Sequence, residues 1–417
     1  MEENILMRGS VEDKADKMND RLTELFTGIQ KLCDELQGLQ RIYNQSVIHL
    51  LQLQNEKESM KFLYKNLKAR YQSILHPDEV IKTRLISQVN PDVYTLSNVP
   101  YNVEPNNTNI HLKYAIRTNA VICAMDFSQD GSIFAFSNND LIFVVSTEDG
   151  SLMKCFEIPN TNVDDFNVRA INISPNCNYL AVGGPSNNVI IYSLHEEKII
   201  ANLESHENKV SSLMFTNDSK RLYSAGFDGR VYVWDLPTMR SITKIEAPKN
   251  STKADSMVIS LSKNSDEDFI VIGFINGILG ISEMSLFQPL NTFRAHGEGQ
   301  YLLDSKVSPL DGTLATVSHD KTCKIWNLRG VATCTKVLTG HSDTVLSVCF
   351  APNSTHCFTA SRDERFKAWN YKTGELLFTV KAHSNTVFKI IHHPSENILG
   401  TCSGDGYVCI WEYGQLE

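Results

Sequence analysis

The chain has 417 residues, 42% of them hydrophobic and 21% charged, a composition typical of soluble globular proteins and a length beyond one ordinary domain. No window approaches the ~18 consecutive apolar residues of a membrane span, and the acidic start "MEENILMRGS" lacks a signal peptide's apolar run. Residues 1–75 carry 11 acidic and 11 basic side chains, so the whole net charge of −9 falls on residues 76–417, which argues against direct nucleic-acid binding.

The first predicted element is a long helix. From Leu22 to Ile74 there is no proline, and apolar residues step by alternating threes and fours, which predicts a coiled coil over residues 12–75. Further apolar residues flank this seam, which favours three or four helices over two, so we expect a homotetramer. A dimeric coiled coil and an intramolecular hairpin are the alternatives. The seam residues are Leu22, Leu25, Ile29, Leu32, Leu36, Leu39, Leu50, Leu53, Met60 and Leu67.

Residues 76–108 are predicted to form a linker, because they contain four prolines and close in a polar tract. From residue 109 to 415 the apolar period changes to two, and short strand-like runs recur at roughly 40 residues, which indicates the blades of a β-propeller. The fold class is therefore mainly β. The first strands of seven units are expected near Ala120, Val168, Val210, Met257, Tyr301, Val345 and Val387.

The last unit stops at "CIWEY" with only three strands. The segment "NIHLKYAI", which precedes the first unit, is the simplest source of its fourth strand. Such closure ties the two ends of the ring together and leaves no open sheet edge between the blades.

Four units place a Trp six residues after an Asp, a hydroxyl four residues before that Asp, and a His 28 or 30 residues before the Trp. We interpret each set as an intrablade hydrogen-bond lock, in which a buried Trp N–H and a buried imidazole are both satisfied. The sets are His206, Ser224, Asp228 and Trp234; His296, Thr316, Asp320 and Trp326; His341, Thr359, Asp363 and Trp369; and His383, Thr401, Asp405 and Trp411.

A catalytic triad is the weaker interpretation of these groups, because a nucleophile is needed once and the pattern recurs four times. The chain also lacks a P-loop, HExxH and a dinucleotide loop, so no enzymatic activity is expected. The ten cysteines occur singly, without CxxC, so neither zinc, disulfides nor another cofactor is expected. Units 1, 2 and 4 lack the lock, with Tyr192 at the Trp position of unit 2, and we expect apolar packing alone to hold them.

The stretch "HSDTVLSVCFAPNSTHCFTASRDERFKAWN" resembles a WD-repeat unit, which implies a seven-bladed ring. The helix "RLTELFTGIQKLCDELQGLQRIY" resembles the Tup oligomerisation domain, and "VICAMDFSQDGSIFAF" and "TCSGDGYVCIWEY" resemble blades of fungal-type Tup transcriptional corepressors. This resemblance implies a nuclear scaffold whose helices form a tetramer and engage a tetratricopeptide-repeat partner, while DNA-bound repressors recruit the propeller. The short linker departs from that family, which puts histone binding by a separate linker in doubt.

Two other classes remain open. A G-protein β subunit also joins a helix to a seven-bladed ring, although its helix is shorter. A ubiquitin-ligase substrate receptor would carry W-D-x-R after a strand, and "IWNLRG" offers Trp326 and Arg329 with Asn327 in place of the Asp.

In a propeller, the turns beside the locking Asp and the loops leading to the innermost strands lie on one rim. The residue before each Asp, and the residue two positions before each first strand, are therefore expected on this top face. Aromatic residues and Arg are the types that supply most binding energy at interfaces. The candidate partner-binding residues are Phe166, Asn208, Phe227, His319, Asp343, Arg362, Asn385 and Gly404.

Overall fold

The structure is a computed structural model, and it describes residues 93–94, 102–103, 110–118, 120–138, 141–159, 168–183, 187–247, 255–285 and 289–415. The chain divides into two compact units, Met1–Gln88 and Val89–Glu417. The predicted coiled coil, all of its seam residues and most of the predicted linker lie outside the described residues. No helix in the described part is long and apolar enough to cross a membrane.

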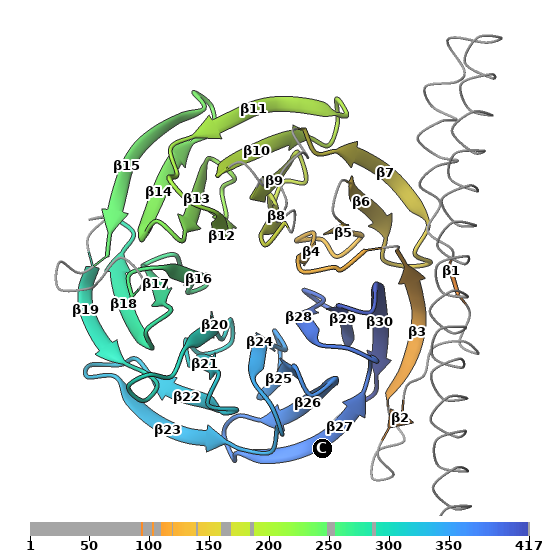
Figure 1. Ribbon diagram of the computed structural model, residues 1–417, viewed down its shortest axis with the longest axis vertical. Helices are drawn as coiled ribbons and strands as arrows, with labels where there is room; N and C mark the ends of the chain where they lie inside the picture. The colour runs from red at the N-terminus through yellow and green to blue at the C-terminus, as the bar shows by residue number, and fades with distance from the viewer. Residues whose placement is uncertain are drawn as a thin grey trace, which may run out of the picture. The chain divides into compact units, whose positions relative to one another are not determined.

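The described residues of the second unit form seven antiparallel sheets arranged as blades in a ring (Figure 1). The predicted seven-bladed β-propeller is therefore confirmed. Blade 1 consists of β4 (Met125–Phe127), β5 (Ile133–Ser137), β6 (Leu141–Ser146) and β7 (Leu152–Glu157). Blade 2 consists of β8 (Ile171–Ile173), β9 (Tyr179–Gly183), β10 (Asn188–Ser193) and β11 (Lys198–Glu204). Blade 3 consists of β12 (Val210–Phe215), β13 (Arg221–Gly226), β14 (Arg230–Asp235) and β15 (Arg240–Glu246).

The remaining blades follow the same order from the inner to the outer strand. Blade 4 consists of β16 (Val258–Lys263), β17 (Phe269–Phe274), β18 (Ile278–Glu283) and β19 (Pro289–Arg294). Blade 5 consists of β20 (Leu302–Val307), β21 (Leu314–Ser318), β22 (Cys323–Asn327) and β23 (Thr333–Leu338). Blade 6 consists of β24 (Val345–Phe350), β25 (His356–Ser361), β26 (Arg365–Asn370), β27 (Glu375–Lys381) and β2 (Asn102–Val103). Blade 7 consists of β28 (Val387–His392), β29 (Ile398–Ser403), β30 (Tyr407–Tyr413), β3 (Ile110–Arg117) and β1 (Val93–Tyr94).

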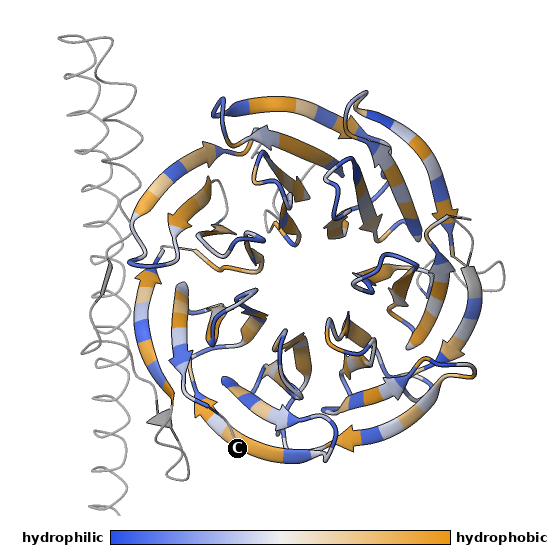
Figure 2. Cartoon of the chain, turned by 180° about the vertical axis from the view of Figure 1, so that it is seen from behind, coloured by the Kyte–Doolittle hydropathy of each residue, from blue (hydrophilic) through white to orange (hydrophobic). Residues whose placement is uncertain are grey.

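The hydrophobic core lies between neighbouring blades. The middle strands are covered on both faces, so β25 is buried along its whole length, whereas the outer strand β15 is mostly exposed. Figure 2 shows the same gradient, with long apolar stretches in the middle strands and mixed residues on the outermost ones. One core cluster joins Val317 and Ile325 of blade 5 to Val348 and Trp369 of blade 6. Each blade therefore depends on its neighbours for burial.

The ring closes as the sequence predicts. Strand β3, from the start of the propeller, pairs antiparallel with β30 from its end, and Thr118 N–H donates to Gly406 O at 2.7 Å. The predicted linker differs from the structure at two points. Val93 pairs with Ile116 of β3, and Asn102 pairs with Lys381 of β27, so two short strands extend the outer edges of blades 7 and 6.

The predicted strand starts are accurate in five blades and early in two. Three inner strands begin at the predicted residues, and β16 and β20 begin one residue later. In blades 1 and 2 the inner strands begin at Met125 and Ile171 rather than near Ala120 and Val168. These two are also the shortest of the seven inner strands, with three residues each.

Candidate functional site

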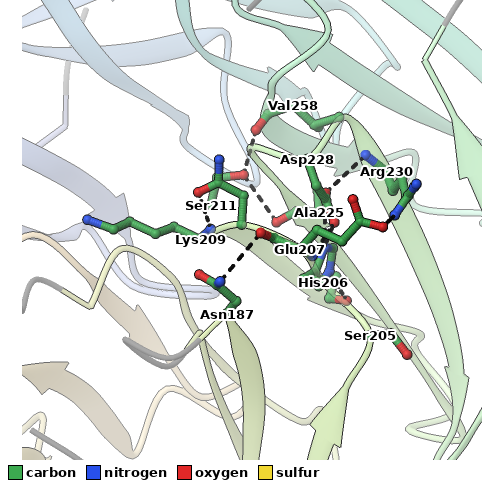
Figure 3. A network of polar contacts seen from close by, with 12 residues as sticks. Asn187, Ser205, His206, Glu207, Lys209, Ser211, Ala225, Asp228, Arg230 and Val258 are labelled. Carbon is green, nitrogen blue, oxygen red and sulfur yellow. Dashed lines mark hydrogen bonds and ion pairs between the residues drawn. The ribbon is translucent and has the colours of Figure 1, made fainter. Parts of the chain in front are cut away.

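The four predicted locks are each brought together within one blade, and blade 3 shows the arrangement. His206 Nδ1 lies 2.9 Å from Asp228 Oδ2, its Nε2 lies 2.8 Å from Ser224 Oγ, and Trp234 Nε1 donates to the same Oγ at 2.9 Å. If the imidazole is neutral, donates its Nδ1–H to Asp228 and accepts a hydrogen bond from the Ser224 hydroxyl at Nε2, every polar group of the lock has a partner. Figure 3 shows His206 beneath Asp228, beside the ion pair of Glu207 and Arg230.

The other three sets repeat this geometry. The distances from His Nδ1 to the carboxylate, from His Nε2 to the hydroxyl, and from Trp Nε1 to the hydroxyl agree within a few tenths of an ångström. They are 2.7, 2.9 and 3.0 Å for His296, Asp320, Thr316 and Trp326; 2.8, 2.8 and 2.9 Å for His341, Asp363, Thr359 and Trp369; and 3.1, 2.9 and 3.0 Å for His383, Asp405, Thr401 and Trp411. The hydroxyls are fully buried, so these groups hold the blades rather than face a substrate.

Three of the four locking carboxylates, those of Asp228, Asp363 and Asp405, also tie two backbone segments together. Asp228 accepts the N–H groups of Glu207 at 3.0 Å and of Arg230 at 3.2 Å. Burial alone would raise the pKa of Asp228, but its hydrogen bond with His206 and these N–H groups together lower it. The same balance lowers the pKa of Asp363 and Asp405.

Blade 5 satisfies its aspartate differently, since two extra residues separate His296 from its Trp. Both the N–H and the hydroxyl of Thr322 donate to Asp320 Oδ1, at 3.0 and 2.6 Å. The hydroxyl takes the place of the backbone N–H that follows the His in blade 3, that of Glu207. Burial again raises the pKa of Asp320, but the bonds from His296 and Thr322 outweigh it and lower the pKa to about 2.

The expectation that apolar packing alone holds blades 1, 2 and 4 is wrong. The Tyr192 hydroxyl, at the Trp position of blade 2, donates to Glu157 O of blade 1 at 2.9 Å. Tyr114 of blade 7 donates to Thr147 O of blade 1 at 2.8 Å, and Ser260 and Ser305 bond across blades 4 and 5 at 2.7 Å. Blades without an internal lock are thus bonded to their neighbours.

The rim that carries the four locking aspartates is called the aspartate rim below. Backbone bonds place the residue before each Asp beside the residue that precedes the inner strand. Phe227 N–H donates to Lys209 O, His319 N–H to Tyr301 O, Arg362 N–H to Thr344 O, and Gly404 N–H to Thr386 O.

The side chains of the predicted partner-binding residues also meet on the aspartate rim. Arg362 is 67% exposed, and its Nε lies 3.8 Å from Asp343 Oδ2. The His319 and Tyr301 rings lie 6.2 Å apart, and Tyr301, which is not among the predicted partner-binding residues, is 51% exposed. Gly404 lies against the Asn385 side chain, because a Cβ added at Gly404 would be only 3.2 Å from Asn385 Cγ.

Blades 2 and 3 contribute the rest of the predicted rim. Phe227 is half-buried beneath the Arg169 guanidinium, 5.7 Å from its ring centroid, and Asn208 Oδ1 accepts the N–H of Lys209. Phe166 lies outside the described residues. Arg169 was missed by sequence reasoning, although its place just before an inner strand was a usable signal.

A cavity of about 230 Å³ lies at the centre of the ring, lined by six of the seven inner strands. Sequence reasoning missed the polar side chains that link successive inner strands around the ring. Each accepts a backbone N–H from the next inner strand. The bonds are Asp126 to Ile173 (2.9 Å), Asn172 to Phe215 (2.9 Å), Ser212 to Leu261 (3.1 Å), Ser262 to Val307 (2.8 Å), Asp304 to Val348 (3.4 Å) and Ser347 to Ile390 (3.3 Å).

The charged side chains that line this central cavity are mainly cationic. Arg169, Lys306 and Lys389 line it together with the single carboxylate Asp126. Burial raises the pKa of Asp126 to about 6, against its hydrogen bond from Ile173 and the charge of Lys306. Burial lowers the pKa of Lys306, whereas the Asp304 carboxylate, 3.3 Å from the ammonium, outweighs burial and raises the pKa of Lys389. The cavity therefore favours an anionic group over a cationic one.

Known proteins match parts of this sequence. Residues 121–412 match the family model described as the IFT122 first β-propeller. The chain is 26% identical over 259 residues to "Target of rapamycin complex subunit LST8-1" of Arabidopsis thaliana, which covers 51% of this chain and 82% of that protein. It is 23% identical over 242 residues to "Transcriptional corepressor LEUNIG_HOMOLOG" of Arabidopsis thaliana, with 56% and 28% covered. It is 25% identical over 217 residues to "Protein HIR1" of Candida albicans, with 48% and 22% covered. The aligned region thus spans less than a third of two of these relatives.

Proposed function

The chain belongs to the WD-repeat β-propeller family, and from this premise we propose that it is a non-enzymatic transcriptional corepressor scaffold of the Tup type. Its N-terminal helix assembles a homotetramer and engages a tetratricopeptide-repeat partner. DNA-bound repressors dock on the aspartate rim and bring the assembly to promoters in the nucleus, without direct nucleic-acid binding.

The observation that carries the recruitment step is the pairing of side chains on the aspartate rim. Exposed Arg362 and Tyr301 and half-buried Phe227 lie on turns that the buried locks hold in place. Arg and aromatic side chains on a rigid support are the groups that dominate binding at protein interfaces. A carboxylate or an apolar side chain of a repressor is the matching partner group.

Two further points support the corepressor assignment. The heptad seam of residues 22–74 suits self-association, and the acidic propeller suits recruitment by another DNA-binding protein. LEUNIG_HOMOLOG, by its name a transcriptional corepressor, aligns with 56% of this chain.

Affinity purification tests the proposal directly. The full chain, a chain without residues 12–75, and a full chain with Phe227→Ala and Arg362→Ala are purified from nuclear extract with their partners. We expect DNA-binding repressors with the first two and their loss from the third. The tetratricopeptide-repeat partner should be lost only when residues 12–75 are removed. Recovery of neither class with the full chain contradicts the proposal.

A second candidate function is an adaptor subunit of another complex. LST8-1, by its name a subunit of a target of rapamycin complex, is matched over 82% of its length. A cavity of about 350 Å³ between blades 5 and 6 is lined by Trp326, Asn327 and Arg329, where a ubiquitin-ligase substrate receptor would carry its W-D-x-R motif. A monomer in gel filtration and recovery of ligase subunits would favour this candidate, whereas a tetramer favours the corepressor.

A further inference from the structure

Five of the seven inner strands carry a β-bulge at the same place, just below the aspartate rim. In blade 5, Leu302 pairs with Ser318 and Asp304 with Val317, so Leu303 is left without a pairing partner in the ladder. The register shifts in the same way in the other four. The bulged residues are Ser211, Ile259, Leu303, Leu346 and Phe388, from blades 3 to 7.

The bulges turn apolar side chains out of the core. Ile259, Leu303, Leu346 and Phe388 are half-buried, although each follows a fully buried residue at the start of its strand. Bulges commonly re-aim a side chain next to a binding site. Because β16, β20, β24 and β28 are successive inner strands of the ring (Figure 1), these four residues form an arc, called the apolar crescent below.

The apolar crescent is part of the aspartate rim. The N–H groups of His319, Arg362 and Gly404 donate to the carbonyl groups of Tyr301, Thr344 and Thr386, which lie two residues before Leu303, Leu346 and Phe388. A Cβ on Gly404 would lie 3.3 Å from Phe388 Cε2, so the absence of a side chain at Gly404 leaves room for the aromatic ring of Phe388.

The opposite side of the ring is polar and cationic. At the position of the bulge, blade 2 has the exposed Arg169, and blade 3 has Ser211, and both line the central cavity. Farther along the inner strands the same cavity is lined by Lys306 and Lys389. A ligand on the rim therefore meets apolar side chains in blades 4 to 7 and cations in blade 2 and in the cavity.

We propose that the aspartate rim binds a short acidic segment of a partner protein, with apolar side chains on the apolar crescent and a carboxylate in the central cavity. The inference rests on the proposed function for the use of this rim, and it adds the chemistry of the segment. The lining cations Arg169, Lys306 and Lys389 outnumber the carboxylates Asp126 and Asp304 by one, which gives the charge complementarity, and a cavity of about 230 Å³ admits one side chain rather than a folded domain.

The test uses a phage library of random dodecapeptides selected against the full chain. We expect enrichment of peptides that combine Leu, Ile or Phe with Asp or Glu. Synthetic labelled copies of the enriched peptides should bind at least tenfold more weakly to Leu346→Ser and to Lys306→Met. Binding to Lys306→Arg should be retained, because the charge remains.

Matched controls are Leu376→Ser, an apolar residue exposed on the outer strand β27, and Lys198→Met on β11. Neither should change binding by more than twofold, and thermal melting should show that every variant is folded. Enriched peptides without acidic residues, or unchanged binding to folded Leu346→Ser and Lys306→Met, would overturn the inference. So would displacement of the peptide by millimolar inorganic phosphate without dependence on Leu346, which indicates a small-anion site.

The two proposals fail separately. If the rim selects acidic and apolar peptides but no DNA-binding repressor needs Phe227 and Arg362, the proposed function fails and this inference stands. If repressors need Phe227 and Arg362 but tolerate Leu346→Ser and Lys306→Met, the inference fails and the proposed function stands.

Discussion

His341 and Asp363 lie 2.8 Å apart, Nδ1 to Oδ2, and both side chains are almost wholly buried although they belong to different loops of blade 6. The same carboxylate accepts the N–H groups of Ser342 and Arg365, at 3.0 and 3.1 Å. One side chain thus satisfies three donors, the buried ring N–H of His341 and two backbone N–H groups.

The first prediction follows from those three donors. Asp363→Ala should lower the free energy of unfolding by about 1–3 kcal/mol, because it leaves the His341 ring N–H and two backbone N–H groups without an acceptor. Glu375→Ala, at an exposed position of the same blade, is the control and should stay within about 0.5 kcal/mol. Denaturant unfolding measures both, and equal midpoints for wild type and Asp363→Ala would contradict the lock.

A second prediction concerns acid. The folded pKa of Asp320, about 2, lies below its ordinary value of 3.8, so its ionised form stabilises the fold above about pH 4. This contribution, about 2 kcal/mol, is lost as the pH falls from about 4 to 2. Asp320→Asn should therefore lose less stability over that interval than wild type. Parallel curves of unfolding free energy against pH would contradict the assignment.

Asp126 should show the opposite sign. Its folded pKa of about 6 lies above the ordinary 3.8, so its protonated form stabilises the fold below about pH 4, and this contribution is lost as the pH rises through 6. Asp126→Asn keeps an oxygen for the Ile173 N–H and removes the charge. Relative to wild type, the variant should gain about 2–3 kcal/mol between pH 4 and 7.5. Thermal or denaturant unfolding at the two pH values measures the difference, which should be absent from Asp149→Asn.

A fourth prediction tests the N-terminal helix. The full chain should sediment as a tetramer, and Leu32→Asp with Leu53→Asp should dissociate it, because an unpaired charge in a helix seam is strongly destabilising. Gln30→Asp with Gln54→Asp, at positions that are not seam residues, should leave the tetramer intact. Sedimentation equilibrium decides the matter, and a monomeric wild type at micromolar concentration would end the tetramer hypothesis.

The fifth prediction concerns recruitment. Arg362→Ala with Phe227→Ala should leave thermal melting and oligomeric state unchanged and weaken binding of a DNA-bound repressor by about 1–2 kcal/mol for each anchor. Lys198→Ala with Ile199→Ala, on the outer strand β11, is the matched control. Titration calorimetry or pull-down with a repressor identified by affinity purification gives the measurement. Undiminished binding by the folded rim variant would remove this rim as the recruitment surface.

The sequence predicted the locks well because each is local and repeated. The Asp and the Trp are six residues apart in every copy, as Asp363 and Trp369 are in blade 6. Four copies with the same spacing leave little ambiguity about which residues belong to a lock. The paired strand β3 was predictable for a related reason, since a terminal unit with three strands requires a fourth.

The bonds between blades were not predictable in this way. Asp126 accepts the Ile173 N–H across two blades, and six different inner-strand side chains of three chemical types make the equivalent contacts. The sequence around a single polar residue in an apolar strand does not indicate its hydrogen-bond partner, because that partner belongs to the neighbouring blade. The bulges were missed for the same reason, because an extra residue such as Leu303 is defined only by the strand opposite.

The pairing of β3 with β30 also sets the order in which the molecule can be completed. Thr118 and Gly406, which bond at the closure, are 288 residues apart in the chain. On the ribosome, β3 emerges early and exposes Leu112 and Ile116, which are fully buried in the finished ring, until β30 has been synthesised. A nonsense mutation just before residue 407 would remove β30. It would therefore also leave β3 without the strand with which it pairs. A truncation that spares six complete blades should therefore still leave the ring unable to close.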